Sequence, residues 1–243
     1  MTAAEGEEII IARRFNGPPD SGNGGYVCGR LAAFVDSTAQ VTLRRPPPLE
    51  TPLDITRDGV CVRLSREGEL IAEAEPAPLE LDVPRAPSLA EAEAAVPGFP
   101  GFENHELPTC FVCGTEREAG DGLCIHPGPV ARRDDGLLAC PWTPAPGLAD
   151  PQGLVRAEFL WSALDCPGAF AVQWAEQGAL CLLGRLTARL DERPRAGARL
   201  IVAGWPIGRD GRKRFAGTAV YTEEGRPIAR ASAVWIELKQ PPA

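Results

Sequence analysis

The sequence lacks any long hydrophobic run. None of its apolar stretches approaches the length of about 20 residues that spans a lipid bilayer. The first residues, MTAAEGEE, are acidic and lack the basic and then apolar order of a secretion signal. These two absences predict a cytoplasmic protein with no membrane partner.

An excess of positive charge is also missing. The chain carries 25 Lys and Arg residues against 33 Asp and Glu residues, a formal net charge of -8, and its basic residues form no stripe. Because nucleic-acid binding depends on a basic surface, we expect no nucleic-acid partner. With 243 residues, 44% of them hydrophobic, the chain is long enough for one large or two small globular domains.

The eight cysteines have no secretion signal before them, so we expect free thiols rather than a disulfide framework. Four of them lie inside apolar stretches, where a cysteine is usually a small buried side chain: Cys28, Cys61, Cys166 and Cys181.

Cys110 and Cys113 form the motif CFVCG, whose spacing can supply half of a zinc site. The other half would have to come from residues that form no second close pair: Cys124, His126, Cys140 or His105. The sequence therefore favours a structural turn with two thiols, and we predict no metal and no cofactor.

The same order of predicted elements occurs twice along the chain. The first half reads as a strand, a helix and four strands, at 7–15, 24–36, 39–46, 51–58, 60–68 and 69–76. The second half repeats this order at 136–142, 157–173, 179–190, 198–207, 214–225 and 226–238. Each half ends in a similar hairpin, LSREGELIAEA and YTEEGRPIARA, with Glu-Gly at the turn. Internal duplication is the simplest explanation.

Between the halves, residues 84–108 are rich in Pro, Ala and Glu, and they predict a linker with one short helix after Ser88. We therefore expect an N-terminal unit at 1–85, a linker at 86–108 and a C-terminal unit at 109–243. Each unit is predicted as α+β, one helix embraced by an antiparallel sheet of about five strands.

A helix followed by a long meander, repeated in tandem, resembles the double hot-dog fold of acyl-CoA thioesterases. NGGYVCGRLAAF, VTLRRPPPLETPLDI and DGVCVRLSREGELIAEA look like the first repeat of bacterial thioesterase II. CFVCG followed by GDGLCI looks like a segment of phenylacetyl-CoA-type thioesterase relatives. The resemblance covers nearly the whole chain except the linker. It implies two antiparallel sheets, each wrapping a central helix, and an acyl-CoA or acyl-carrier thioester as substrate.

Phenylacetyl-CoA-type thioesterases carry a His-Gly-Gly loop at the start of the central helix and an acidic residue nine positions after the histidine. In the first half Asn23 stands at the histidine position and is followed by Gly24 and Gly25. Ala32 stands at the acidic position, so this half has the glycines without the carboxylate.

The second half has the carboxylate without the glycines. Arg156 stands at the histidine position, Ala157 and Glu158 replace the glycines, and Asp165 stands at the acidic position. In that family each site joins the glycine loop of one unit to the carboxylate of the other. The resemblance therefore implies one composite site and the loss of its mirror image.

In the implied site the bare amides of Gly24 and Gly25 stabilise the oxyanion of thioester hydrolysis, and Asp165 is a general base or a nucleophile. The glycines can instead permit a tight turn before the helix, and Asp165, directly before Cys-Pro-Gly, can instead end a helix.

Asn23, Arg156, Glu158 and Trp161 are the candidate substrate-binding residues. Arg156 and Glu158 can instead form an ion pair at the helix start, and Trp161 can instead pack in the core. The acidic, Thr and Gln set of thioesterase II has no convincing counterpart in LGRLTARL, AGWPIG or ARASAV, which leaves the helix-borne aspartate as the catalytic candidate.

Two other functions are compatible with the resemblance. The first is a non-catalytic module that binds an acyl group or another small ligand. The second is a hot-dog hydratase, which the sequence disfavours because its only histidines, His105 and His126, lie away from either predicted central helix. Exposed sheet edges would permit a homo-oligomer, although a double unit can also remain a monomer.

Overall fold

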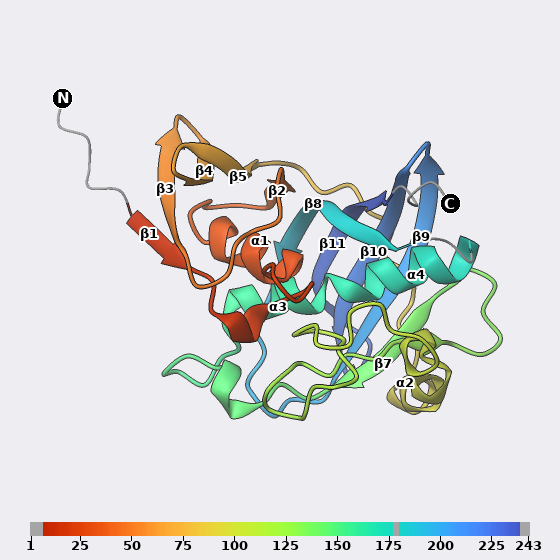
Figure 1. Ribbon diagram of the computed structural model, residues 1–243. Coiled ribbons are helices and arrows are strands. Elements are labelled where there is room, and N and C mark those ends of the chain that lie inside the picture. The colour runs from red at the N-terminus through yellow and green to blue at the C-terminus, as the bar shows by residue number, and fades with distance from the viewer. Residues whose placement is uncertain (1–6, 177–179, 239–243) are drawn as a thin grey trace.

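The computed structural model describes residues 7–176 and 180–238. It has the predicted α+β composition, with an antiparallel sheet that carries helices on its faces (Figure 1). Residues 1–6, the first part of the stretch MTAAEGEE, and Ala179 at the start of the strand predicted at 179–190 lie outside the described residues. No helix in the described part of the chain is long and apolar enough to cross a membrane.

The first half follows the predicted order closely. Its elements are β1 (Glu7–Ile10), the 3-10 turn η1 (Arg13–Phe15), α1 (Gly24–Ala32), β2 (Ala39–Leu43), β3 (Pro52–Asp58), β4 (Cys61–Arg66) and β5 (Glu69–Pro76). The β4–β5 hairpin turns at Glu67 and Gly68, both with positive φ, as a two-residue turn requires.

The segment between the halves contains the short helix expected after Ser88. Its elements are α2 (Leu89–Ala95), η2 (Val96–Gly98) and η3 (Pro100–Phe102). Ser88 caps α2 and Glu91 bonds back to the Ser88 amide, which completes a capping box.

The second half contains β6 (Gly128–Pro129), β7 (Leu138–Trp142), η4 (Pro146–Leu148), α3 (Ala157–Ala163), α4 (Cys166–Glu176), β8 (Cys181–Leu190), β9 (Leu200–Asp210), β10 (Lys213–Thr222) and β11 (Pro227–Glu237). The predicted single helix at 157–173 is therefore wrong, because it is divided into α3 and α4. Pro167 has no N–H for a helical bond, which explains the break. Asp165 lies in this break.

The strands of the two halves join into a continuous sheet. Within the described residues its order is β1-β3-β4-β5-β2-β8-β11-β10-β9-β7-β6. The order of the first five strands is mirrored in the next five, as a duplication predicts. The expected pair of separate sheets is not seen, because β2 and β8 pair antiparallel, with Val41 opposite Leu186. Without this pairing each strand would leave an exposed sheet edge.

The two faces of the sheet are covered by different helices. Helices α1, α3 and α4 lie on one face, where their apolar side chains form a core that contains residues of both halves (Figure 1). On the other face Leu89, Ala92 and Ala95 of α2 pack in a second cluster with β7, β9 and β10. The break between α3 and α4 therefore lies close to α1, where the halves meet.

Candidate active site

A cavity of about 460 Å³ opens between the two halves. Its lining comes from the loop before α1, from residues 104–113, and from α4 with β8 and β11. Most of this surface is apolar, including the side chains of Leu43, Leu107, Phe170, Leu183 and Trp235. A concave apolar site with few polar groups is typical of small-molecule binding.

The N-terminus of α1 forms one wall of this cavity. The first amides of a helix have no partner within it, so each needs one elsewhere. Asn23 N–H donates to Phe15 O, Gly25 N–H to Asp165 Oδ2, and Tyr26 N–H to the Asn23 side chain. For the N–H of Gly24, which lines the cavity, we find no partner in the described part of the chain.

Asp165 reaches this helix end from the second half. Its Oδ2 accepts hydrogen bonds from Gly25 N–H and Asn23 Nδ2, both at 2.8 Å. The residue is 2% exposed, yet Oδ1 has no hydrogen-bond partner among the described residues. Burial raises the pKa of Asp165 to about 7, although the Gly25 and Asn23 hydrogen bonds favour the charged form.

The glycines allow α1 to approach α3 closely. A Cβ at Gly25 would lie 2.6 Å from Asp165 Cβ, and one at Gly29 would lie 2.6 Å from Glu158 Cα. A Cβ at Gly24 would lie 2.9 Å from Leu183 Cδ2. Close packing therefore requires these glycines. Because the Gly25 amide is bound to Asp165, Gly24 alone of the two keeps an open donor.

Three thiols lie beside the carboxylate. The Sγ atoms of Cys110, Cys113 and Cys166 are all buried and lie within 4.8 Å of one another. Hydrogen bonds from the other two thiols hold the pKa of Cys110 well below its usual range. This grouping is not evident in the sequence, because Cys166 has no paired spacing and lies in an apolar stretch.

All eight cysteines, each in the described part of the chain, are free thiols as predicted. Cys28, Cys166 and Cys181 are buried, as expected from their apolar neighbours, whereas Cys61 is only half-buried. It is the first residue of β4 and lies opposite Asp58 of β3.

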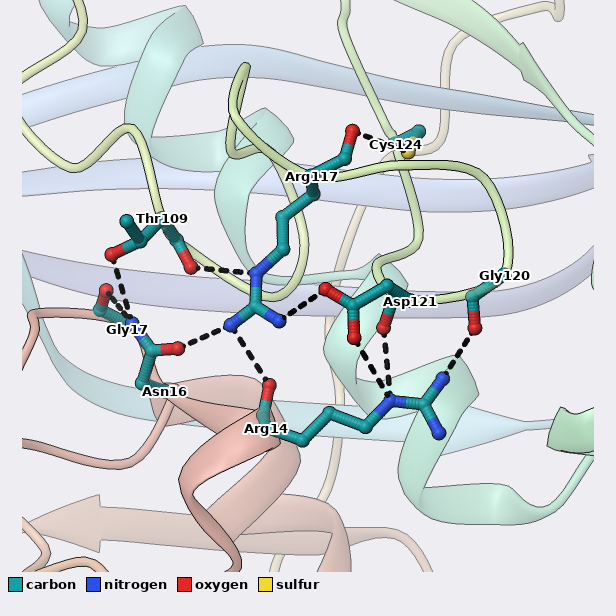
Figure 2. Close-up of polar contacts among 8 residues, drawn as sticks. All are labelled: Arg14, Asn16, Gly17, Thr109, Arg117, Gly120, Asp121 and Cys124. Carbon is teal, nitrogen blue, oxygen red and sulfur yellow. Dashed lines mark hydrogen bonds and ion pairs between the residues drawn. The ribbon is translucent and has the colours of Figure 1, made fainter.

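The loop that carries Cys110 and Cys113 is tied to the N-terminal segment. Figure 2 shows the Arg117 guanidinium between Thr109 O, Asp121 and two groups of that segment, Arg14 O and Asn16 Oδ1. The Arg117 side chain is only 12% exposed. Together with the Phe111 N–H to Asn16 O bond of 2.8 Å, these contacts place the loop against the start of α1.

The other predicted substrate-binding residues lie apart from the cavity lining. Arg156 forms an ion pair with Glu158, at 3.4 Å, and its guanidinium stacks over the Phe159 ring. Trp161 is buried against Gly29. The ion-pair and core-packing alternatives describe these three residues, whereas Asn23 lines the cavity.

Solved structures similar to this chain share its fold over nearly their full length. A protein from Thermobifida fusca, described as a candidate thioesterase II, has a TM-score of 0.63 at 13% identity, with 98% of this chain and 94% of that chain covered. The acyl-CoA thioesterase II TesB2 from Mycobacterium marinum has a TM-score of 0.58 at 16% identity, with 96% and 93% covered.

A further structure, a hot-dog-fold protein of unknown function from Alicyclobacillus acidocaldarius, has a TM-score of 0.62 at 12% identity, with 96% of this chain and 93% of that chain covered. No protein-family model and no curated protein matches the sequence. The structural similarities confirm the predicted likeness to thioesterase II proteins at the level of the fold.

Proposed function

We propose that this double hot-dog chain hydrolyses acyl thioesters, with acyl-CoA as the substrate class. The observation that carries the proposal is the pairing of Asp165 of one half with Asn23 and Gly25 of the other, in the wall of an apolar cavity. The similar fold of a protein named as an acyl-CoA thioesterase supports the same substrate class.

In this proposal the thioester carbonyl oxygen binds at the N-terminus of α1. Gly24 lines the cavity and its N–H has no partner among the described residues, and the positive end of the helix dipole favours a developing negative charge. One such donor contributes about 3 kcal/mol to transition-state stabilisation in well-studied enzymes. A bare glycine lets the carbonyl approach the amide.

Asp165 is the general base or the nucleophile of the proposed reaction. Asn23 and Gly25 orient the carboxylate through Oδ2, which leaves Oδ1 free to take a proton from water or to attack directly. In the base route Oδ1 takes a proton from water while the water oxygen forms a bond to the carbonyl carbon. When the tetrahedral intermediate collapses, the C–S bond breaks and the proton on Asp165 passes to the departing carrier sulfur. The products are a carboxylic acid and a thiol.

The apolar walls are the proposed site of the acyl chain. Leu43, Leu107 and Phe170 would contact it, since they line the cavity.

Trp235 Nε1, also buried at the cavity, has no hydrogen-bond partner among the described residues and is a donor for a substrate oxygen. Buried polar groups usually have a partner, which supports ligand binding here.

The Asp165→Asn variant tests the proposal. We expect kcat for acyl-CoA hydrolysis to fall about 100-fold or more, because the amide cannot act as a base. Release of free CoA thiol from a panel of acyl-CoAs is the measurement, and circular dichroism checks the fold. Asp36→Asn, at an exposed position outside the cavity lining, is the control and keeps wild-type turnover.

Unchanged turnover in Asp165→Asn would contradict the assignment of this residue. If the wild-type protein hydrolyses none of the panel but co-purifies with an acyl-CoA, the chain is a binding protein instead. Mass spectrometry of the purified protein distinguishes this second outcome.

A further inference from the structure

Three thiols from two distant parts of the chain converge at the cavity. Cys110 and Cys113 come from the loop before β6, and Cys166 is the first residue of α4. All three line the cavity and are buried. The two-residue spacing of the first pair is the one that zinc-binding loops use.

The spacing of the sulfur atoms matches tetrahedral coordination. Two thiolates bound to one zinc ion at about 2.3 Å lie about 3.8 Å apart in a regular tetrahedron. Cys110 Sγ and Cys166 Sγ are 3.7 Å apart, and no pair in the group exceeds 4.8 Å. These distances are far longer than the S–S bond of a disulfide, about 2.05 Å, and the three thiols are free.

The loop is held in this position by contacts outside the thiol group. Leu123 N–H donates to Phe111 O and Ile125 N–H to Val112 O, so the residues between the two cysteines pair with a neighbouring segment. A Cβ at Gly114 would lie 2.5 Å from Cys110 O, which keeps the turn tight. A preformed ligand arrangement reduces the ordering needed when a metal binds.

The carboxylate of the proposed hydrolytic site lies next to these thiols. Asp165, which precedes Cys166, has an unpartnered Oδ1 although the residue is 2% exposed. Asn23 Nδ2 lies 2.8 Å from Asp165 Oδ2 and 3.8 Å from Cys110 Sγ, so the carboxylate and the thiols share a neighbour. An oxygen that finds no partner in the described chain is available to a metal or to a metal-bound water.

The geometry points to a Zn²⁺ site in which Cys110, Cys113 and Cys166 are the protein ligands and the fourth coordination position faces the cavity. Three protein ligands with one open position are typical of zinc sites that bind water or substrate. This site goes beyond the hydrolysis proposed above, which uses Asp165 and the α1 amides and requires no metal.

The test is zinc binding by the full chain, measured after removal of metal and reloading under reducing conditions. We expect one Zn²⁺ per chain by elemental mass spectrometry, and a zinc affinity about 100-fold lower or more in Cys110→Ala, Cys113→Ala or Cys166→Ala, measured by competition with a chromophoric chelator. Cys140→Ala removes a buried thiol outside the group and is the matched control.

X-ray absorption at the zinc edge of the loaded wild-type protein gives a readout that needs no variant. Three sulfur neighbours at about 2.3 Å are expected. Zinc held only by nitrogen or oxygen, no zinc retained by the wild type, or an equal loss of affinity in Cys140→Ala would overturn the proposal. Asp165→Asn is expected to keep its zinc, so hydrolysis and metal binding can fail separately.

Discussion

Gly25 and Gly29 lie on the side of α1 that faces α3. Their missing side chains let the two helix backbones touch, because a Cβ at Gly25 would lie 2.7 Å from Trp161 O. For Gly25 the sequence suggested an amide exposed to a ligand or a tight turn before the helix. The structure adds a third reason, the close approach that brings the Asp165 carboxylate to the Gly25 amide.

At the scale of a single residue, we predict that Gly25→Ala destabilises the protein by about 1–3 kcal/mol, the usual cost of adding a methyl group to a tightly packed site. The clash involves backbone atoms of α3 and the Cβ atom of Asp165, which cannot rotate away. Urea unfolding measures the free energy. Gly147→Ala in η4, where a Cβ meets nothing within 4 Å, is the control and should leave stability nearly unchanged. Equal midpoints for the two variants would contradict the tight contact.

Helices α1 and α2 both begin with a polar N-cap residue, but the two caps have different roles. Asn23 caps α1 by accepting from Tyr26 N–H, and its Nδ2 also orients Asp165. Ser88 caps α2 by accepting from Glu91 N–H, and it does not line the cavity. One cap therefore combines helix stability with the proposed chemistry, whereas the other supports the helix alone.

The paired variants Asn23→Ala and Ser88→Ala separate these two roles. Each should cost about 1 kcal/mol of stability, the ordinary value of an N-cap. Only Asn23→Ala should also lower kcat, because the Asp165 carboxylate loses one of its two orienting donors. Thermal unfolding and acyl-CoA hydrolysis are measured on both. A similar kcat decrease in Ser88→Ala would show that helix stability, and not the orientation of Asp165, sets the rate.

At the scale of the whole molecule, both halves share a sheet and a core. The β2–β8 ladder joins their sheets, and the main cluster combines Leu31 and Leu53 of the first half with Leu160 and Val202 of the second. The proposed composite site lies where the halves meet. Unit boundaries at 85 and 109 and a homo-oligomer remain predictions.

We therefore predict that the chain unfolds in one cooperative transition, with equal calorimetric and van't Hoff enthalpies. Fragments 1–85 and 109–243, expressed alone, should be unfolded or aggregated, because each would expose an unpaired strand and half of the core. Calorimetry of the chain and circular dichroism of the fragments are the measurements. Two separate transitions, or a fragment that folds alone, would contradict this prediction.

Much of the local structure was predictable because it depends on neighbouring residues. The Glu-Gly turns, the helix after Ser88 and the order of strands follow from turn chemistry, capping and hydrophobic periodicity. The sequence left open whether the helix continues through Asp165 or ends there. Periodicity favoured one helix across it, whereas Pro167 prevented one.

The sequence by itself determined the repeated order of elements, since turns, caps and hydrophobic periodicity are local patterns of residue type. Only the tertiary structure decided that β2 pairs with β8, that the Gly25 amide is bound by Asp165 while Gly24 stays open, and that Cys166 joins Cys110 and Cys113. These contacts join residues far apart in the chain. Their geometry depends on how whole elements pack, which no short stretch of sequence specifies.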